Sequence, residues 1–467
     1  MNGSCPAIVV AGSGSGVGKT SITLGLASAL TRRGMRVQTF KAGPDFLDPT
    51  YLSIASGRKS YNLDTWMCGA DYARNLFADK TRDADIALVE GAMGMYDGAS
   101  PTNSAGSSAE IAELLEAPVL LALNAKGAGR SLAAVVKGFV EFERGARIVG
   151  VAANFLGSEN HARILREALD SAGLPPLMAG VIKGAFPELS SRHLGLVSAD
   201  ARTLTSAIIA QLGSAIETHC DVDAIVSAAS SVVPRTAPRL PENSGGQVRI
   251  GIARDDAFHF YYHDSLEAIE RAGATLIFFS PMRDEALPDG LDGLYIGGGY
   301  PEVYAEELSR NTSMIGSVAE FAESGKPVYA ECGGLIYLSS GVETTDGARY
   351  PLAGVMPVWT RMRRSFKTLG YATATLRRDT LLGGQGETIR GHMFHYSELV
   401  EDPLRCDGWS AAYTVRRNRG EEMAEGYSRG NILATYLHAS LGANSRAVES
   451  FVERCRMTAH LKEVTNG

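Results

Sequence analysis

A glycine-rich turn near the start of the chain restricts its fold more than any other feature. The segment Ala11–Thr20 reads Ala-Gly-Ser-Gly-Ser-Gly-Val-Gly-Lys-Thr, follows an apolar run at Ala7–Ala11 and precedes a helical pattern at Ser21–Arg33. A strand, a glycine-rich loop and a helix in this order form a phosphate-binding loop, in which backbone N–H groups surround phosphate oxygens. The sequence therefore predicts a nucleotide site in an α/β domain.

The loop residues have expected roles toward ATP and Mg²⁺. Lys19 should reach the β and γ phosphates, and the Thr20 hydroxyl should bind Mg²⁺. The residues expected to bind the nucleotide are Gly14, Ser15, Gly16, Val17, Gly18, Lys19 and Thr20. Ser13 stands where the strict motif has glycine. The alternative is a structural turn with a chance Gly-Lys-Thr, but the flanking strand and helix favour a nucleotide site.

Similar apolar runs recur along the first half of the chain, separated by helix-length segments. They lie at Arg36–Phe40, Asp85–Val89, Val119–Leu123 and Ile148–Ala152. Regular alternation of this kind predicts a doubly wound parallel sheet.

Charged residues follow two of these runs. Lys41 and Asp45 come after the second strand, and Glu90 ends the third. Because the carboxyl ends of parallel strands meet at one edge of a sheet, Asp45 and Glu90 could hold the metal, while Lys41 could neutralise the transferred phosphate. Gly, Pro and Asp are also ordinary turn residues, so simple turn formation is the alternative.

A segment rich in Ser, Pro, Asn and Gly runs from Ser230 to Gly246. It predicts a linker at 231–247 between an N-terminal domain, 1–230, and a C-terminal domain, 248–467. Strands at Val248–Ala253, Thr275–Phe279 and Gly293–Ile296, with a helix at Leu266–Ala272, predict a second α/β domain. The pattern at Met356–Arg378 predicts an antiparallel extension of it.

Cys332 lies at the junction of a strand and a helix. Lys326–Glu331 has a strand pattern, Cys332 and two glycines form a sharp turn, and Leu335–Ser339 begins a helix. This arrangement predicts a nucleophile elbow in which the helix N-terminus stabilises a thiolate. The other five cysteines form no C-x-x-C pair, so we expect a structural role and no zinc ribbon or disulfide framework.

A base for Cys332 is expected from a distant strand end. His438 closes the apolar segment Leu433–His438, although no acid stands two residues later, where Ser440 lies. The glycines after another strand could place backbone N–H groups beside an oxyanion. The candidates are Gly298, Gly299 and Gly333.

Eight segments together resemble the cobyrinic acid a,c-diamide synthase family. They are Gly12–Thr20, Lys41–Pro49, Ser56–Asp64, Glu90–Gly98, Arg192–Val197, Gly297–Glu302, Glu331–Gly334 and Arg390–Ser397. These segments span nearly the whole chain in the family's order. The resemblance implies an N-terminal P-loop domain similar to dethiobiotin synthetase, with a parallel sheet, followed by a C-terminal triad-type (class I) glutamine amidotransferase α/β domain.

The resemblance also implies a reaction. Cys332 would form a γ-glutamyl thioester with L-glutamine and release ammonia, ATP would phosphorylate the a- and c-acetates of a carboxylated tetrapyrrole, and ammonia would displace phosphate. Because an acyl phosphate hydrolyses in water, the two sites are expected to face each other. The residues implied to handle the substrate are Asp45, Phe46, Leu47, Asp48, Asp97 and His193.

Alternatives stay open at this point. Met393 stands where the family commonly has Glu, so siroheme and nickel sirohydrochlorin are alternative tetrapyrroles. A glutamine-hydrolysing ligase for an unrelated carboxylate would keep the same residues. A regulatory or partition ATPase with a non-catalytic amidotransferase module is the third alternative, although it would not require both Cys332 and His438.

Composition narrows the class of protein. The chain has 467 residues, of which 45% are hydrophobic and 21% charged, which is typical of a soluble protein of two or three domains. The net charge of −7 gives no broad attraction for nucleic acid or anionic lipid. No apolar run approaches the roughly 20 residues of a membrane span, and no signal peptide is evident. We expect a cytoplasmic protein without nucleic-acid or membrane partners, and the family suggests a homodimer.

Overall fold

The computed structural model describes residues 5–187, 206–232, 248–365, 367–417, 420 and 422–465. The chain forms two compact units that divide between Leu240 and Pro241, within the range predicted as a linker. Each unit has its own hydrophobic core. The motif Arg192–Val197, which includes His193, lies outside the described residues.

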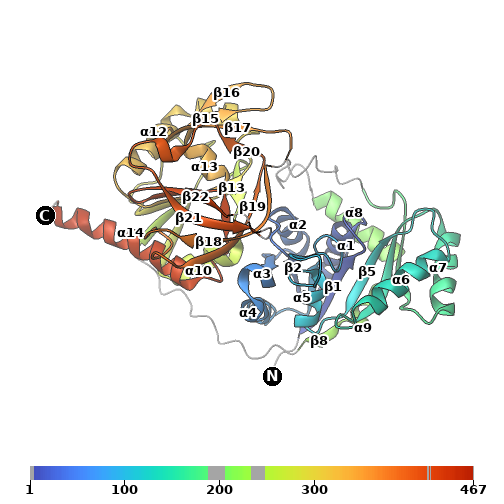
Figure 1. Cartoon of the computed structure of the whole chain (residues 1–467). Helices are drawn as coiled ribbons and strands as arrows, with labels where there is room; N and C mark the ends of the chain where they lie inside the picture. Colours follow the sequence, from blue (N-terminus) through green and yellow to red (C-terminus); the bar gives the residue numbers. More distant parts are fainter. Residues whose placement is uncertain are drawn as a thin grey trace. The chain divides into compact units, whose positions relative to one another are not determined.

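The first unit is built on a sheet, and Figure 1 labels its strands β1, β2 and β5 among the surrounding helices. The strand order is β3-β2-β4-β1-β5-β6-β7, and every neighbouring pair is parallel. These strands are β1 (Cys5–Gly12), β2 (Val37–Ala42), β3 (Tyr61–Leu63), β4 (Ile86–Glu90), β5 (Val119–Asn124), β6 (Ile148–Leu156) and β7 (Leu177–Ile182). The inner strands are buried on both faces, which explains their continuous apolar runs. The predicted parallel sheet is confirmed.

Helices connect these strands. They are α1 (Lys19–Arg32), α2 (Leu47–Ser56), α3 (Thr65–Cys68), α4 (Ala70–Lys80), α5 (Ser108–Leu114), α6 (Ser131–Phe142), α7 (Glu159–Ser171), α8 (Ser206–His219) and α9 (Val222–Ala228). A short strand, β8 (Ser230–Val232), then pairs antiparallel with β1. Ser231 and Val232, which the sequence analysis places in the linker, are therefore part of this sheet.

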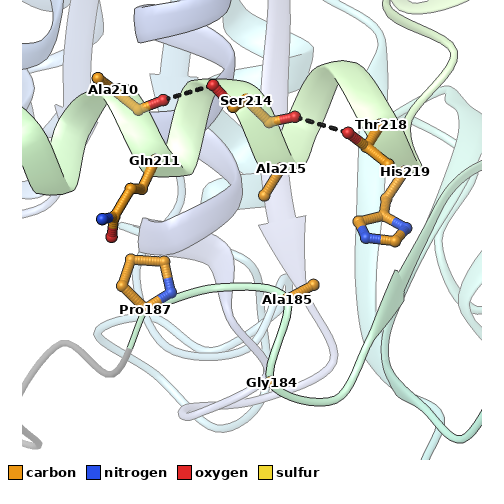
Figure 2. Close-up of a pocket in the computed structure, with 9 residues that line it drawn as sticks. All are labelled: Gly184, Ala185, Pro187, Ala210, Gln211, Ser214, Ala215, Thr218 and His219. Carbon is orange, nitrogen blue, oxygen red and sulfur yellow. Dashed lines mark hydrogen bonds between the residues drawn. The ribbon is translucent and has the colours of Figure 1, made fainter.

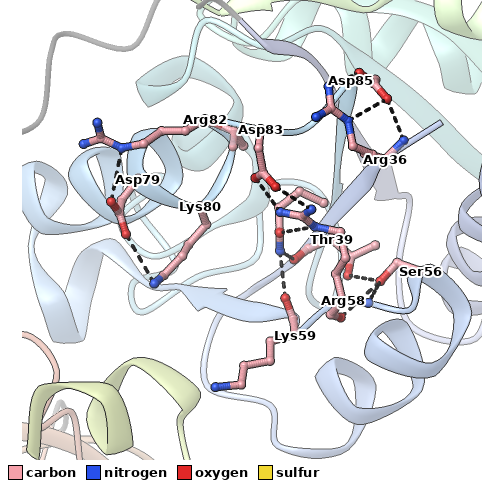
Figure 3. Close-up of polar contacts among 12 residues, drawn as sticks. Arg36, Thr39, Ser56, Arg58, Lys59, Asp79, Lys80, Arg82, Asp83 and Asp85 are labelled. Carbon is pink, nitrogen blue, oxygen red and sulfur yellow. Dashed lines mark hydrogen bonds and ion pairs between the residues drawn. The ribbon is translucent and has the colours of Figure 1, made fainter. Parts of the chain in front are cut away.

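Ion pairs fix the amino-terminal ends of β2 and β4 (Figure 3). Arg36 precedes β2 and lies 2.7 Å from Asp85, which precedes β4. Arg58 lies 2.7 Å from Asp83 and also donates to Gln38 Oε1 at 3.1 Å. These pairs are largely exposed to solvent, so each contributes little to stability. They lie at the edge of the sheet opposite to the glycine-rich loop.

The second unit has a ten-stranded sheet of order β11-β9-β12-β14-β23-β22-β21-β18-β19-β24. Its strands are β9 (Val248–Ala253), β11 (Ala274–Phe279), β12 (Gly293–Ile296), β14 (Val328–Glu331), β18 (Thr368–Leu376), β19 (Thr388–His395), β21 (Ser410–Arg417), β22 (Glu422–Arg429), β23 (Ile432–Thr435) and β24 (Leu437–Ala439). The pairs from β11 to β23 are parallel and the rest are antiparallel. The predicted second α/β domain is thus present.

Smaller elements complete the second unit. β10 (Phe258–Phe260) pairs with β13 (Gly298–Gly299), and a separate sheet contains β15 (Ser339–Glu343), β16 (Arg349–Pro351), β17 (Met356–Met362) and β20 (Ser397–Leu399). The helices are α10 (His263–Arg271), α11 (Ala305–Arg310), α12 (Thr312–Glu323), α13 (Gly333–Leu338), the 3-10 turn η1 (Pro403–Arg405) and α14 (Ser445–Thr465). Within the described ranges, none of the helices is long and apolar enough to cross a bilayer.

The segment Met356–Arg378 includes the predicted antiparallel extension and contributes strands to two sheets. It splits into β17, which pairs parallel with β15 in the small sheet, and β18, which pairs antiparallel with β19 and β21 in the large one. Arg361 and Arg363 on this segment each lie 2.7 Å from a carboxylate, Glu343 and Glu398 respectively.

Helix packing in the first unit gives a stability prediction. A Cβ on Gly25 of α1 would lie 2.4 Å from Ile216 Cγ1 and 2.9 Å from the Leu212 carbonyl oxygen, both on α8. We expect Gly25→Ala to lower the free energy of unfolding by about 1–3 kcal/mol, because α8 must move. The measurement is urea denaturation followed by circular dichroism.

The matched control is Gly138→Ala in α6, where a Cβ would meet open space. This change should raise stability by up to about 1 kcal/mol, since alanine favours a helix. Equal effects of the two substitutions would contradict the packing explanation.

Candidate active sites

The loop between β1 and α1 has the backbone of a phosphate cradle. Gly16 and Gly18 have φ values of 75° and 98°. A Cβ on Gly18 would lie 2.1 Å from Asn154 Nδ2, which donates to the Val17 carbonyl at 3.2 Å. Asn154 therefore holds the loop from β6, and glycine is required where the two meet. Sequence reasoning missed Asn154 because it is distant in the chain and carries no motif.

Lys19 connects this loop to the segment after β4. Its Nζ donates to the carbonyl oxygens of Gly14 at 2.8 Å and Met93 at 2.5 Å. The N–H of Met95 also donates to the Gly12 carbonyl at 2.7 Å. Burial and the nearby Lys41 ammonium together lower the pKa of Lys19 to about 8. The Glu90–Gly98 motif is thus brought against the phosphate loop, as expected from adjacent strand ends.

A buried charge cluster lies beside the loop. Lys41 Nζ is 2.7 Å from Asp48 Oδ2 and 3.0 Å from Glu90 Oε1, and Thr20 donates to the same Glu90 oxygen at 2.6 Å. Burial and the Asp48 carboxylate raise the pKa of Glu90 to about 7. Although burial disfavours the Lys41 ammonium, Asp48 and Glu90 raise its pKa overall. The Lys41 ammonium therefore stabilises both carboxylates in the protein interior, while the two carboxylates disfavour each other's charge.

The donors in this cluster fit a magnesium ion. Glu90 Oε2 is buried and accepts no hydrogen bond from the described residues, and the Thr20 hydroxyl is bound to the other oxygen of the same carboxylate. The described part of the chain has no group of three or more His, Cys, Asp or Glu side chains that could hold a metal. Mg²⁺ commonly takes few protein ligands, together with phosphate oxygens and water.

The other residues expected to bind metal or substrate in this unit have mixed positions. Asp45 uses Oδ1 to accept the N–H groups of Leu47 and Asp48 at 2.8 and 2.9 Å, so it caps α2, and Asp48 Oδ2 lies 2.7 Å from Lys41 Nζ. Phe46 and Leu47 begin α2, with Leu47 buried. Asp97 is exposed and closes the turn after β4 by accepting the Gly94 N–H at 2.8 Å.

A pocket of about 580 Å³ lies elsewhere in this unit, between the segment after β7 and α8 (Figure 2). Gly184, Ala185 and Pro187 form one side, and residues of α8 form the other. The Ser214 and Thr218 hydroxyls in its lining donate to carbonyls of their own helix. Those hydroxyls are therefore occupied within α8, and the loop with its charge cluster is the better candidate for chemistry.

In the second unit, Cys332 occupies a strained turn between β14 and α13. Its φ of 47° and ψ of −95° are rare for a residue with a side chain. Its N–H donates to the Thr435 carbonyl at 2.7 Å, and a Cβ on the nearby Gly334 would lie 2.0 Å from the Ile296 carbonyl oxygen. The backbone has the form of a nucleophile elbow.

His438 lies in β24 beside the cysteine. The segment Leu433–His438 is not one strand, because Tyr436 separates β23 from β24. Glu425 stabilises this break by accepting the Thr435 hydroxyl and the Tyr436 N–H, both at 2.6 Å. Burial lowers the pKa of His438, but Cys332 and Glu331 outweigh burial and raise it to about 10. His438 is therefore suited to pair as an imidazolium with a Cys332 thiolate.

The motif Arg390–Ser397 forms the strand that supports His438. In β19, His392 is paired with His438, and their rings stack with centroids 5.0 Å apart. Burial and His438 hold the pKa of His392 well below 6.5. A Cβ on Gly391 would lie 2.2 Å from the His438 carbonyl oxygen, so the close approach requires glycine. Sequence reasoning used this motif for the family resemblance and assigned it no role.

The three predicted oxyanion glycines lie together next to this pair. A Cβ on Gly333 would be 3.0 Å from the Gly299 nitrogen, and a Cβ on Gly298 would be 2.6 Å from His438 Cε1. Backbone groups thus approach the Cys332–His438 pair more closely than side chains would permit. This arrangement can place N–H groups around an oxyanion.

An acid that sequence reasoning missed also lies at this site. Glu331 Oε2 is 3.8 Å from His438 Nδ1, and both side chains are 2% exposed. Its signal in the sequence is a carboxylate inside the buried strand that precedes the cysteine, where a charge requires a partner.

Comparisons with known proteins match each of the two units to a family model. Residues 8–195 match the family model described as the CobQ/CobB/MinD/ParA nucleotide binding domain. Residues 249–446 match the CobB/CobQ-like glutamine amidotransferase domain. A protein of Syntrophotalea carbinolica named cobyrinate a,c-diamide synthase is 52% identical, over 97% of this chain and 99% of its own length.

Two further relatives extend this match. A cobyrinate a,c-diamide synthase of Leptospira interrogans is 40% identical, over 97% of this chain and 99% of its own. A hydrogenobyrinate a,c-diamide synthase of Streptomyces coelicolor is also 40% identical, over 97% and 98%. This chain belongs to the cobyrinate a,c-diamide synthase family. It is a glutamine-hydrolysing amidoligase with a nucleotide-binding domain and a glutamine amidotransferase domain, as the sequence predicted.

The charge cluster gives a prediction about stability. We expect Lys41→Met to lower the free energy of unfolding by about 3–5 kcal/mol, because Asp48 and Glu90 would remain buried without their cation. Arg163→Met is the control, since Arg163 forms an exposed pair with Glu167. Urea denaturation of both variants measures the difference, and equally small effects would refute the assigned role of Lys41.

Proposed function

We propose that this protein is an ATP-dependent cobyrinate a,c-diamide synthase, which converts the a- and c-acetates of the tetrapyrrole to amides with nitrogen from glutamine. The observation that carries the proposal is that one chain combines a strained cysteine elbow with a phosphate loop that lies beside a buried cluster of Lys41, Asp48 and Glu90. The names of full-length relatives support cobyrinate as the substrate.

The amidotransferase half follows from the second unit. The Cys332 thiolate attacks the glutamine carboxamide carbon, a C–S bond forms, and the C–N bond breaks as His438 gives its proton to the leaving ammonia. Water then attacks the thioester and gives a proton back to His438, which releases glutamate and restores the thiolate. Backbone N–H groups of Gly299 and Gly333 would hold the oxyanion in both steps. Gly298 contributes by having no side chain that would collide with the His438 ring.

The ligase half follows from the first unit. The acetate oxygen attacks the γ phosphate of ATP, ADP leaves, and ammonia displaces phosphate from the acyl phosphate to give the amide. Residues 14–18 would bind the phosphates through backbone N–H groups, while Lys19 and Lys41 neutralise charge as it moves. Thr20 and Glu90 would hold Mg²⁺, which would offset the negative charge of the phosphates. Asp45 caps α2, so Asp48 is the better candidate beside Lys41 and Glu90 for contact with the substrate or metal site.

Cobyrinate is favoured over the other tetrapyrroles by two observations. The relatives described above are named for cobyrinate or hydrogenobyrinate. Met393, the departure that left siroheme and nickel sirohydrochlorin open, is 1% exposed in the hydrophobic core of the second unit. Its difference from Glu is therefore a change in core packing. We still expect a cytoplasmic homodimer that binds neither nucleic acid nor membrane. All six cysteines lie within the described residues and are free, so no disulfide is present.

Cys332→Ala tests whether glutamine hydrolysis and ATP-dependent amidation take place at separate sites. We expect glutamine-dependent amidation and glutamate release to be lost, because no thioester can form. Amidation of cobyrinate with ammonium chloride and Mg-ATP should remain within about twofold of the wild-type rate, since the ligase site is untouched. Cys220→Ala is the matched control, because burial raises the pKa of that thiol to about 12 and leaves it inert. Continued glutamate release by Cys332→Ala would refute the assignment.

A second experiment tests the substrate. The protein is incubated with Mg-ATP, glutamine labelled with ¹⁵N in its amide, and cobyrinate, siroheme or nickel sirohydrochlorin in parallel. Mass spectrometry should show two labelled amides on cobyrinate and a much lower rate with the others. Preferential labelling of siroheme or nickel sirohydrochlorin would replace the proposed substrate, and ATP hydrolysis without labelling of any of them would reject the tetrapyrrole class.

A further inference from the structure

We propose that Glu331 is a positioning residue for glutamine hydrolysis, which fixes the ring of His438 and stabilises its imidazolium opposite Cys332. This inference rests on the proposed function of the Cys332–His438 pair. It assigns the acid to the residue directly before the nucleophile, and the position two residues after the histidine, Ser440, is not needed for this purpose.

The geometry around Glu331 is specific. Its Oε2 lies 3.8 Å from His438 Nδ1, on the ring atom that can face an acid while Nε2 serves the reaction. Its Oε1 accepts the N–H of Ala439 at 3.1 Å, which is the residue after His438. One carboxylate therefore contacts both the ring and the backbone of β24, so that rotation of the ring and displacement of the strand are both restricted.

Two tyrosines hold the carboxylate in place. Tyr295 donates to Glu331 Oε2 at 3.0 Å, and Tyr329 donates to Oε1. Their rings stack with centroids 5.0 Å apart. Burial, reinforced by the Glu331 charge, raises the pKa of both phenols well above 10, so they stay protonated and act as donors. The hydrogen bonds that water would donate to the Glu331 carboxylate are thus supplied by fixed groups inside the protein.

The aromatic contacts of Tyr295 continue to the segment 297–299, whose glycines are expected to hold the oxyanion. The Tyr261 ring meets the Tyr295 ring edge-on at 5.1 Å. The Tyr261 hydroxyl donates to the Ala253 carbonyl and accepts the Gly297 N–H at 2.8 Å. Gly297 directly precedes Gly298 and Gly299. A rigid aromatic layer therefore fixes both the base and the backbone that would hold the oxyanion.

Other titratable groups around His438 do not take this role. His392 of β19 stacks on the ring, and burial lowers the pKa of His392 and of nearby His395, so both are neutral near pH 7. Glu425 of β22 is also buried, but its two oxygens accept the Thr435 hydroxyl and the Tyr436 N–H. Glu331 is the carboxylate in ion-pair contact with His438 in the described structure.

In the reaction, Glu331 transfers no proton. The proton that His438 gives to ammonia and recovers from water stays on the nitrogen that faces Cys332. The carboxylate stabilises the positive ring before each donation and after each recovery, and it keeps the second ring nitrogen protonated. A purely structural glutamate, which only accepted Ala439 and the tyrosines, would leave these steps unchanged.

The experiment compares Glu331→Gln with Glu343→Gln, whose carboxylate pairs with Arg349 and Arg361 in the small sheet. For Glu331→Gln we expect kcat for glutamate release to fall about 10²-fold with KM within about threefold, whereas ammonia-dependent amidation is kept. The pH profile for alkylation of Cys332 by iodoacetamide, followed by peptide mass spectrometry, should move to higher pH, because the thiolate loses part of its imidazolium partner. Glu343→Gln should leave that profile in place.

The outcomes separate the possibilities. An unchanged kcat and alkylation profile in Glu331→Gln would overturn the inference, and so would an equal shift in both variants or a parallel loss of ammonia-dependent activity. If Glu331→Gln does not fold, Tyr295→Phe replaces it, with an expected loss in kcat of about threefold to tenfold and a smaller shift of the profile; wild-type behaviour would overturn the inference. Glutamate release by Cys332→Ala would instead reject the underlying function.

Discussion

Both units depend on the turn from the carboxyl end of a parallel strand into a helix. At such a turn, backbone N–H groups point outward without partners, so negative charge is stabilised there. In the first unit this turn is the loop between β1 and α1, and in the second it is Cys332 between β14 and α13. The same backbone arrangement thus offers a place for phosphate in one unit and for a thiolate in the other.

The second requirement is that charges taken out of water have fixed partners. Lys41 is held between Asp48 and Glu90, and Glu331 is held by two phenols and a backbone N–H. An isolated buried charge costs several kcal/mol, so these groups are retained only where the fold supplies partners. In each unit the charged cluster lies beside the strained or glycine-rich turn, where it can act on the reacting groups.

The predictable part of the sites was local in sequence. Residues 12–20 and Cys332 with its flanking glycines could be identified because strand, turn and helix follow one another within a few residues. The position of Glu90 was also predictable, since it ends a strand next to β1. The role of Asp45 was harder to predict, because an aspartate that precedes a helix can either cap the helix or bind a metal. In the structure Asp45 caps α2.

By itself the sequence indicated the family and the two α/β units, and it predicted the phosphate loop, the cysteine elbow and a histidine at a strand end, because each of these signals lies within a short segment of the chain. Only the tertiary structure decided that Asn154 holds the loop, that Asp48 contacts Lys41, that β24 is separate from β23, and that Glu331 faces His438. The physical reason is that these contacts join strands distant in the chain, and their register and burial arise only when the sheets assemble.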